Sequence, residues 1–102
     1  MHVITGKFIL DSASEVAKML DALVGRVERS RGRAGCIDYQ FAQSLVDPCE
    51  ILLMEKWASQ GDLDAHMAIP DPEFSEVLAS VRIRSVHISV CEAGEERVMM
   101  ER

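Results

Sequence analysis

His66 is the side chain in this sequence best suited to general acid–base chemistry. It follows Leu63 by three residues and precedes Met67, so in a helix its imidazole lies beside an apolar stripe. A histidine with a pKa near ~6.5 could take a proton from a phenol or an enolisable carbon at neutral pH. The alternative is a core histidine held by one hydrogen bond. Asp62, four residues earlier, could orient the imidazole, although it is also placed to cap the helix.

Tyr39 and Trp57 are the only tyrosine and the only tryptophan, and both fall on strand faces with apolar neighbours. They could wall a cavity for a flat ligand by stacking, or they could fill the core. Glu55 shares its strand parity with Trp57, which puts a carboxylate among apolar side chains. Burial there could raise its pKa and make it an acid or a base. It could instead pair with Arg82 or Arg84 at the sheet edge.

The cysteines and histidines form no metal or redox motif. Cys36, Cys49 and Cys91 are far apart and odd in number, which favours three reduced thiols in a cytoplasmic protein. Cys36 could act as a nucleophile only beside a base that lowered its pKa, and the sequence shows none. No glycine-rich phosphate loop is present either. We therefore expect neither a metal nor an organic cofactor.

Length and charge limit the class of protein. With 102 residues, 48% of them hydrophobic and 27% charged, the chain suits one globular domain over residues 1–102. The net charge of −6 argues against a nucleic-acid partner, because phosphate binding needs clustered positive charge. The longest apolar run, Ile51–Met54, is too short to span a membrane. Lys7 and Asp11 interrupt any signal-peptide core.

Apolar periodicity predicts the elements that must position these residues. Alternation predicts strands at 2–10, 36–46, 50–58 and 85–90, with the middle two joined as a hairpin. Capping patterns begin helices at Ser12 and Ser59, and a further helical segment begins at Asp71 after the break at Pro70. We expect the first helix to run unbroken toward a solvent-exposed end at residues 28–33. Gly6 inside the first strand indicates a bulge or a close approach by another backbone.

The order β-α-β-β-α-β is that of the ferredoxin-like α+β fold, an antiparallel sheet with helices on one face. The third strand is apolar on both faces, because Leu52 and Met54 have the opposite parity to Leu53. The helices can cover only one face, so Leu52 and Met54 need another cover. We therefore expect a homodimer through the sheet face, with the charged segment 92–102 free to pack on the partner.

Three stretches resemble the antibiotic biosynthesis monooxygenase domain family. They are Gly35-Cys36 followed by Tyr39, the strand end Glu55-Lys56-Trp57, and Leu63 to His66 followed by Phe74. In their order and spacing they cover roughly residues 2–91. The resemblance implies a dimeric α+β barrel with a cavity between the helices and the sheet of each monomer. It implies a site with His66 as the catalytic residue and a substrate-binding wall of Trp57, Tyr39, Glu55, Leu53 and Phe74.

The resemblance also implies a reaction class. Well-understood members oxidise aromatic polyketides with molecular oxygen, without metal or flavin. We expect a cofactor-independent monooxygenase for a small aromatic or quinol-like substrate. A non-catalytic small-molecule-binding or stress-associated dimer, or a proton-transfer isomerase of the same fold, are the alternatives.

The sequence departs from the family pattern at several positions. Leu53 stands where the polyketide-oxidising branch has an Asn, and residues 59–80 contain neither the Tyr nor the Arg of that branch. Residues 1–10 lack the Asn of the haem-degrading branch, so haem is not expected as a ligand. These departures weaken the oxygenase expectation without removing it.

Overall fold

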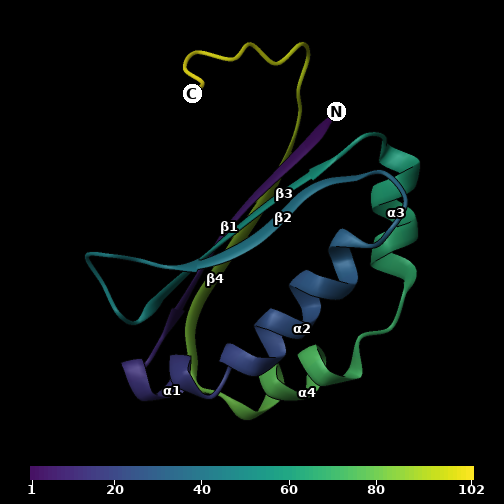
Figure 1. The fold of residues 1–102 in the computed structure, drawn as a ribbon. Helices are drawn as coiled ribbons and strands as arrows, with labels where there is room; N and C mark the ends of the chain where they lie inside the picture. Colours follow the sequence, from purple (N-terminus) through teal and green to yellow (C-terminus); the bar gives the residue numbers. More distant parts are fainter.

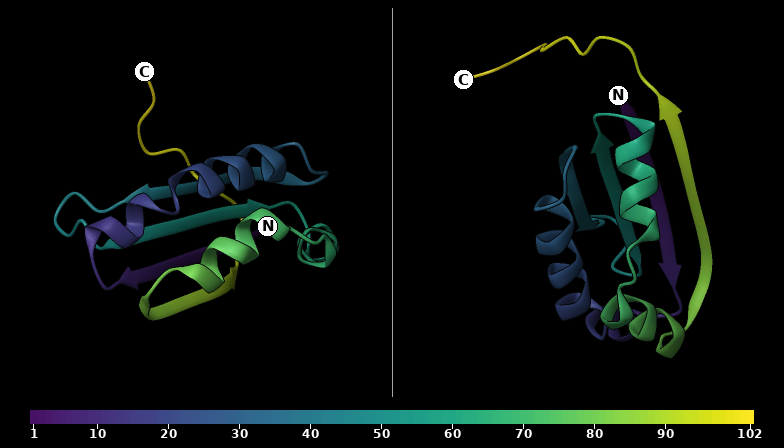
Figure 2. Two further views of the ribbon diagram at one scale, coloured as in Figure 1. Left: turned by 90° about the horizontal axis from the view of Figure 1, so that it is seen from below. Right: turned by 90° about the vertical axis from the view of Figure 1, so that its right-hand side faces the viewer.

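A computed structural model describes residues 1–102 as a four-stranded antiparallel sheet with four helices on one face (Figures 1 and 2). The strands lie in the order β2-β3-β1-β4, which is the ferredoxin-like arrangement that the sequence predicts. The elements are β1 His2–Leu10, α1 Ala13–Ala17, α2 Leu20–Arg31, β2 Cys36–Gln43, β3 Glu50–Trp57, α3 Gln60–Ala68, α4 Pro72–Ser80 and β4 Ile83–Glu92.

The helix starts lie where the capping patterns place them. The side chains of Ser12, Ser59 and Asp71 each accept a hydrogen bond from the backbone N–H three residues later. The first helix, expected to be continuous, is instead divided into α1 and α2. In a complete capping box the Glu15 carboxylate would accept from the backbone N–H of Ser12, but it does not do so here. It accepts from the backbone N–H of Arg82 at 2.7 Å, which ties α1 to the segment before β4 while α2 turns across the sheet.

β1 lies in the middle of the sheet and pairs with both β3 and β4. Gly6 stands directly between Leu53 and Ile88, and a Cβ atom there would lie 3.0 Å from Cγ1 of Ile88. The expected close approach at Gly6 is therefore confirmed, while the expected bulge is not. The register shifts lie elsewhere, at Ile9/Leu10 in β1 and at Cys36/Asp38 in β2.

The core lies between the sheet and the helices. Alternate strand residues point into it, as their periodicity predicts: Ile4, Phe8, Leu10, Tyr39, Ile51, Leu53 and Trp57 are buried. β4 is different, because no helix covers it (Figure 2). Val86, Ile88 and Val90, which pair with the core-facing residues of β1, stay about half-exposed. This edge of the core is therefore open.

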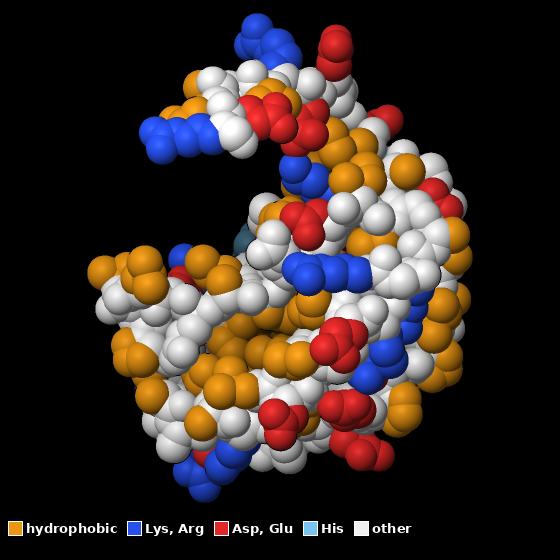
Figure 3. Space-filling model, viewed as in Figure 1, with side chains coloured by type: hydrophobic (Ala, Val, Ile, Leu, Met, Phe, Trp, Pro, Cys, Tyr) orange, Lys and Arg blue, Asp and Glu red, His pale blue; other side chains and the backbone are white.

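The other face of the sheet carries no helix (Figure 1). Leu52 is exposed and Met54 is half-buried there, as the opposite parity of these residues predicts. Lys56, on the same face, forms an ion pair with Glu96 at 2.6 Å, so the segment after β4 bends over this side. A hollow remains between that segment and the β2–β3 hairpin (Figure 3).

None of the helices is long and apolar enough to span a membrane.

Candidate ligand cavity and its polar wall

An apolar cavity of about 570 Å³ lies between the core face of the sheet and the helices α2, α3 and α4. Most of its 18 lining residues are hydrophobic, including Leu53, Phe74 and the half-exposed Val86 and Ile88 of β4. Its mouth is the open edge of the core beside β4. A volume in this range, with an apolar lining and few polar groups, is typical of sites for small organic molecules.

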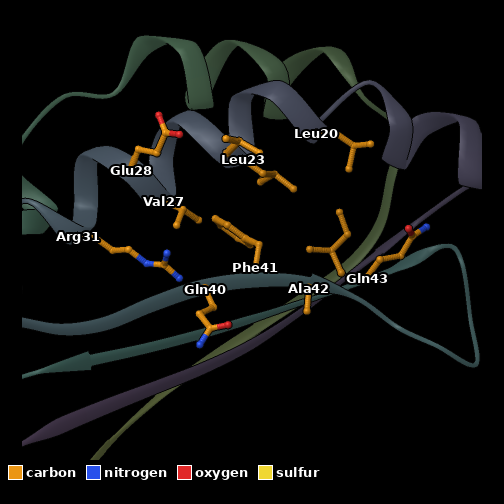
Figure 4. Close-up of a pocket in the computed structure, with 11 residues that line it drawn as sticks. Leu20, Leu23, Val27, Glu28, Arg31, Gln40, Phe41, Ala42 and Gln43 are labelled. Atoms are coloured by element: carbon orange, nitrogen blue, oxygen red, sulfur yellow. The ribbon is translucent and has the colours of Figure 1, made fainter.

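A second hollow of about 470 Å³ lies outside the core, between α2 and the free edge of β2 (Figure 4). Leu23 and Val27 of α2 face Phe41 of β2 across it, and Glu28 and Arg31 flank one end. Hydrophobic side chains gather in this region of the surface (Figure 3). This hollow contains none of the residues expected to do chemistry, so the inner cavity is the candidate site.

The structure brings four of the six expected site residues to the cavity wall. Tyr39, Leu53, Glu55 and Phe74 line it. Trp57 and His66 do not line it, and both are buried in the core. The His66 ring lies 4.5 Å from the Trp57 ring and 5.6 Å from the Tyr39 ring, centroid to centroid. The aromatic and acid–base residues therefore form one group, with His66 in its interior.

Glu55 has one oxygen engaged and one free. Its Oε1 accepts a hydrogen bond from Nε1 of Trp57 at 2.9 Å and lies 3.8 Å from Nε2 of His66. No hydrogen bond within the protein involves its Oε2, and Glu55 is one of the residues that line the cavity. Burial raises the pKa of Glu55, and the Trp57 hydrogen bond and the charge of Arg26 only partly oppose this. Glu55 is therefore a cavity-lining carboxylate with a raised pKa and one oxygen that has no hydrogen-bond partner in the protein.

His66 is held as a neutral ring. Burial, followed by the charges of Arg26 and Arg33, lowers the pKa of His66 to about 4. Nη1 of Arg33 donates to Nδ1, and Nη2 of Arg26 lies 3.4 Å from Nε2, the nitrogen that faces Glu55. Arg33 was expected in solvent; it lies instead against this ring. Asp62 does not orient the imidazole, because its side chain accepts from Ser59.

Arg26 is the polar residue that the sequence analysis missed. It lines the cavity from α2, and its guanidinium carbon lies 4.4 Å from the centre of the Phe74 ring. Its Nε donates to the Tyr39 hydroxyl at 2.9 Å, and its Nη1 to Asp71 at 3.1 Å. Burial, followed by the charge of Glu55, raises the pKa of Tyr39 to about 12, so the phenol stays protonated at neutral pH. An arginine and a tyrosine thus stand in the cavity wall, supplied by α2 and β2.

Two sequence-based alternatives do not hold. Glu55 pairs with neither arginine at the sheet edge: the backbone of Arg82 binds Glu15, and Arg84 approaches Asp11 at 3.6 Å. Cys36 lacks the environment of a nucleophile, because burial, followed by the negative charges of Glu55 and Asp38, raises the pKa of its thiol.

Gly35, beside Cys36, is required by geometry. Its φ is +77°, and a Cβ atom there would collide with the Asp62 side chain. This turn brings Asp62, at the start of α3, against the loop that leads into β2. The glycine therefore lets α3 lie close to the sheet, which places His66 beside Trp57.

The arrangement suits an uncharged or weakly acidic aromatic ligand. The apolar wall excludes water, the aromatic rings offer flat surfaces, and Arg26, Tyr39 and Glu55 supply a donor or acceptor for a ligand oxygen. No three His, Cys, Asp or Glu side chains lie together as metal ligands would. The polar wall is thus equipped for hydrogen bonding and proton transfer by side chains.

The fold and cavity define a ferredoxin-like α+β protein with a cavity between sheet and helices. The chain belongs to the antibiotic biosynthesis monooxygenase family, whose model matches residues 1–78. A family protein from Deinococcus radiodurans has 25% sequence identity and a TM-score of 0.85, over 99% of this chain and 100% of that one. One from Nitrosomonas europaea has 18% identity and a TM-score of 0.79, over 91% and 98% of the chains. A Mycobacterium tuberculosis protein has 20% identity and a TM-score of 0.75, over 96% and 100%. No functionally curated protein matches the sequence.

Proposed function

We propose that this protein is a cofactor-independent monooxygenase for a small aromatic, quinol-like substrate. The observation that carries the proposal is the cavity of about 570 Å³, which is mostly apolar and has Arg26, Tyr39 and Glu55 in its wall. A cavity of this size accommodates an aromatic molecule of two or three fused rings. Membership of the monooxygenase family supports the same reaction class.

The chemistry needs little from the protein beyond a dry site and a place for one proton. Removal of a hydroxyl proton from a quinol leaves an electron-rich anion that can transfer one electron to O2. The two radicals then join at a ring carbon, and the hydroperoxide formed loses water to give a hydroxyquinone. One oxygen atom enters the product and the other leaves as water, so no external reductant is needed. His66 does not line the cavity, and its Nε2 lies 3.8 Å from Oε1 of Glu55. We propose that it assists removal of the hydroxyl proton through Glu55.

The test uses 1,4-naphthohydroquinone as the probe, with O2 consumption and product identity as readouts. We expect O2 uptake above the protein-free rate and formation of 2-hydroxy-1,4-naphthoquinone. Conversion to 1,4-naphthoquinone with hydrogen peroxide, at the protein-free rate, would contradict it. Tight binding of the probe without turnover would instead support the non-catalytic binding protein.

We also infer that the protein acts as a homodimer through the helix-free sheet face. Two observations support this: Leu52 and Met54 lie uncovered on that face, and the face is hollowed between the C-terminal segment and the β2–β3 hairpin (Figure 3). Val98, Met99 and Met100 in that segment are largely exposed as well. An apolar surface of this kind on a small domain is a common site of self-association.

A further inference from the structure

We propose that Glu55, through its Oε2 atom, is the proton acceptor for a hydroxyl group of the bound aromatic ligand. This inference rests on the proposed function, since it assigns the step that makes the substrate anion. The position of the carboxylate carries it: Glu55 lines the cavity, one of its oxygens accepts from the buried Trp57, and the other has no hydrogen-bond partner in the protein.

The anchor fixes the direction of the free oxygen. Nε1 of Trp57 donates to Oε1 from the same strand face, two residues along β3. The Trp57 side chain is fully buried, and His66 packs against it, so the indole N–H cannot turn elsewhere. A carboxylate held on one side in this way presents its second oxygen at a constant position, as a general base must.

The surroundings keep Glu55 reactive. Arg26 of α2 and the N–H of Trp57 favour its charged form, while burial opposes it more strongly. His66 of α3 is neutral, so it does not form a salt bridge that would weaken Glu55 as a base. From β2, Tyr39 stays protonated, as its raised pKa shows. β1 contributes the apolar Ile4 opposite Glu55. The only full positive charge beside this carboxylate is thus Arg26, which is already engaged by Asp71.

Glu55 takes one proton from the ligand and returns it in the same turnover. The ligand O–H bond breaks, the proton passes to Oε2, and the electron pair stays on the ligand oxygen. After O2 has joined the anion at a ring carbon, Glu55 returns this proton to the peroxide oxygen, which gives the neutral hydroperoxide. The outer oxygen then leaves as water, with its own proton and the hydrogen of that ring carbon. The carboxylate is then regenerated for the next turnover, and Glu55 is a catalytic residue because it touches the reacting hydroxyl.

The experiment compares 2-naphthol with 2-methoxynaphthalene, which has the same rings without the hydroxyl proton. The hydroxyl of 2-naphthol, like that of tyrosine, stays protonated through the acidic and neutral range. Affinities are measured by calorimetry across that range for the wild type and for Glu55→Gln. Gln keeps the size of Glu55 and an oxygen for the Trp57 N–H, but it carries no charge. Glu50→Gln is the matched control, because Glu50 lies on the same strand, on the other face, paired with Lys7.

We expect the wild type to bind 2-naphthol about tenfold more tightly than the methyl ether at neutral pH, the worth of a hydrogen bond to a charged group. The preference should vanish as the pH falls through the raised pKa of Glu55. Glu55→Gln should abolish it at every pH, whereas Glu50→Gln should keep it. Trp57→Phe removes the N–H that lowers the pKa of Glu55, so it should move the loss of preference to higher pH. Retention of the wild-type preference by Glu55→Gln, or no preference in the wild type, would overturn the proposal.

The same proteins separate this inference from the proposed function. A naphthol preference that depends on Glu55, with no turnover of 1,4-naphthohydroquinone, would contradict the oxygenase and leave Glu55 as the hydroxyl-binding base. Turnover that persists at the wild-type rate in Glu55→Gln would leave the oxygenase in place and remove Glu55 from the chemistry. We expect Glu55→Gln to lower the turnover rate ~10²–10⁴-fold.

Discussion

Arg26 of α2 and Asp71 at the start of α4 form a buried ion pair, with Nη1 and Oδ2 3.1 Å apart. Their side chains are 12% and 5% exposed, so water screens the pair little. Asp71 also caps α4 through the N–H of Phe74. The pair therefore joins two helices that cover the cavity and holds the Arg26 guanidinium against the Phe74 ring.

Loss of this pair should destabilise the fold. Asp71→Asn keeps the capping oxygen but leaves Arg26 without its buried counter-charge, which should cost about 3 kcal/mol in the free energy of unfolding. Denaturant unfolding of the variant measures the cost. Glu73→Gln is the control, since Glu73 pairs with Arg29 at the exposed surface and should change stability by less than about 1 kcal/mol. Equal effects of the two substitutions would contradict the structural role of Asp71.

His66 should make the fold sensitive to acid. Its pKa is about 4 in the folded protein against 6.5 in the unfolded chain, so the unfolded chain binds the proton more readily. The contribution of the neutral His66 ring to the free energy of unfolding is complete above pH 6.5. It is lost as the pH falls toward 4, and the loss reaches up to roughly 3 kcal/mol. His66→Gln should flatten this part of the pH profile of unfolding. An unchanged profile would show that the ring titrates normally.

Closing the mouth of the cavity should block binding. Val86 lines the mouth and is 48% exposed, so Val86→Trp can be accommodated while its ring covers the opening. We expect it to weaken 2-naphthol binding at least tenfold. Val24→Trp makes the same exchange in the outer hollow of Figure 4 and should leave binding unchanged. The reverse pattern would place the ligand in the outer hollow.

A charge on the helix-free sheet face should prevent dimerisation. Leu52 lies there with 39% of its surface exposed, and Leu52→Glu would bury a charge in the expected interface. Sedimentation at micromolar concentration should give a dimer for the wild type and a monomer for this variant. Ile69→Glu, on the helix side and similarly exposed, should remain dimeric. A monomeric wild type would contradict the interface.

Local patterns predict the strands and helix starts well, because each depends on residues close in sequence. The alternation around Leu53 and Trp57 predicts both their strand and their buried face. The break between α1 and α2 could not be predicted, because it accompanies a bond from Glu15 to the backbone of Arg82, 67 residues away. Gly6 was ambiguous for the same reason, since the approach of Ile88 comes from the last strand.

The site was predicted in part. Tyr39, Glu55 and Phe74 share faces with apolar neighbours, and the family resemblance marks the same positions. Arg26 was overlooked because an arginine in an amphipathic helix is normally solvated. One signal was available: Arg26 stands between Leu23 and Val27, on the apolar stripe itself. The state of His66 could not be predicted, since it is set by Arg33 and Arg26, 33 and 40 residues away in sequence.

Isotope labelling shows whether the protein inserts oxygen into an aromatic ligand. The protein is supplied with 1,4-naphthohydroquinone under heavy-isotope-labelled O2, and the product is analysed by mass spectrometry. We expect one labelled oxygen atom in 2-hydroxy-1,4-naphthoquinone and the other in water, at a rate that Glu55→Gln reduces and Glu50→Gln does not. Unlabelled product, or label incorporation no faster than without protein, would show that this cavity does not catalyse oxygen insertion.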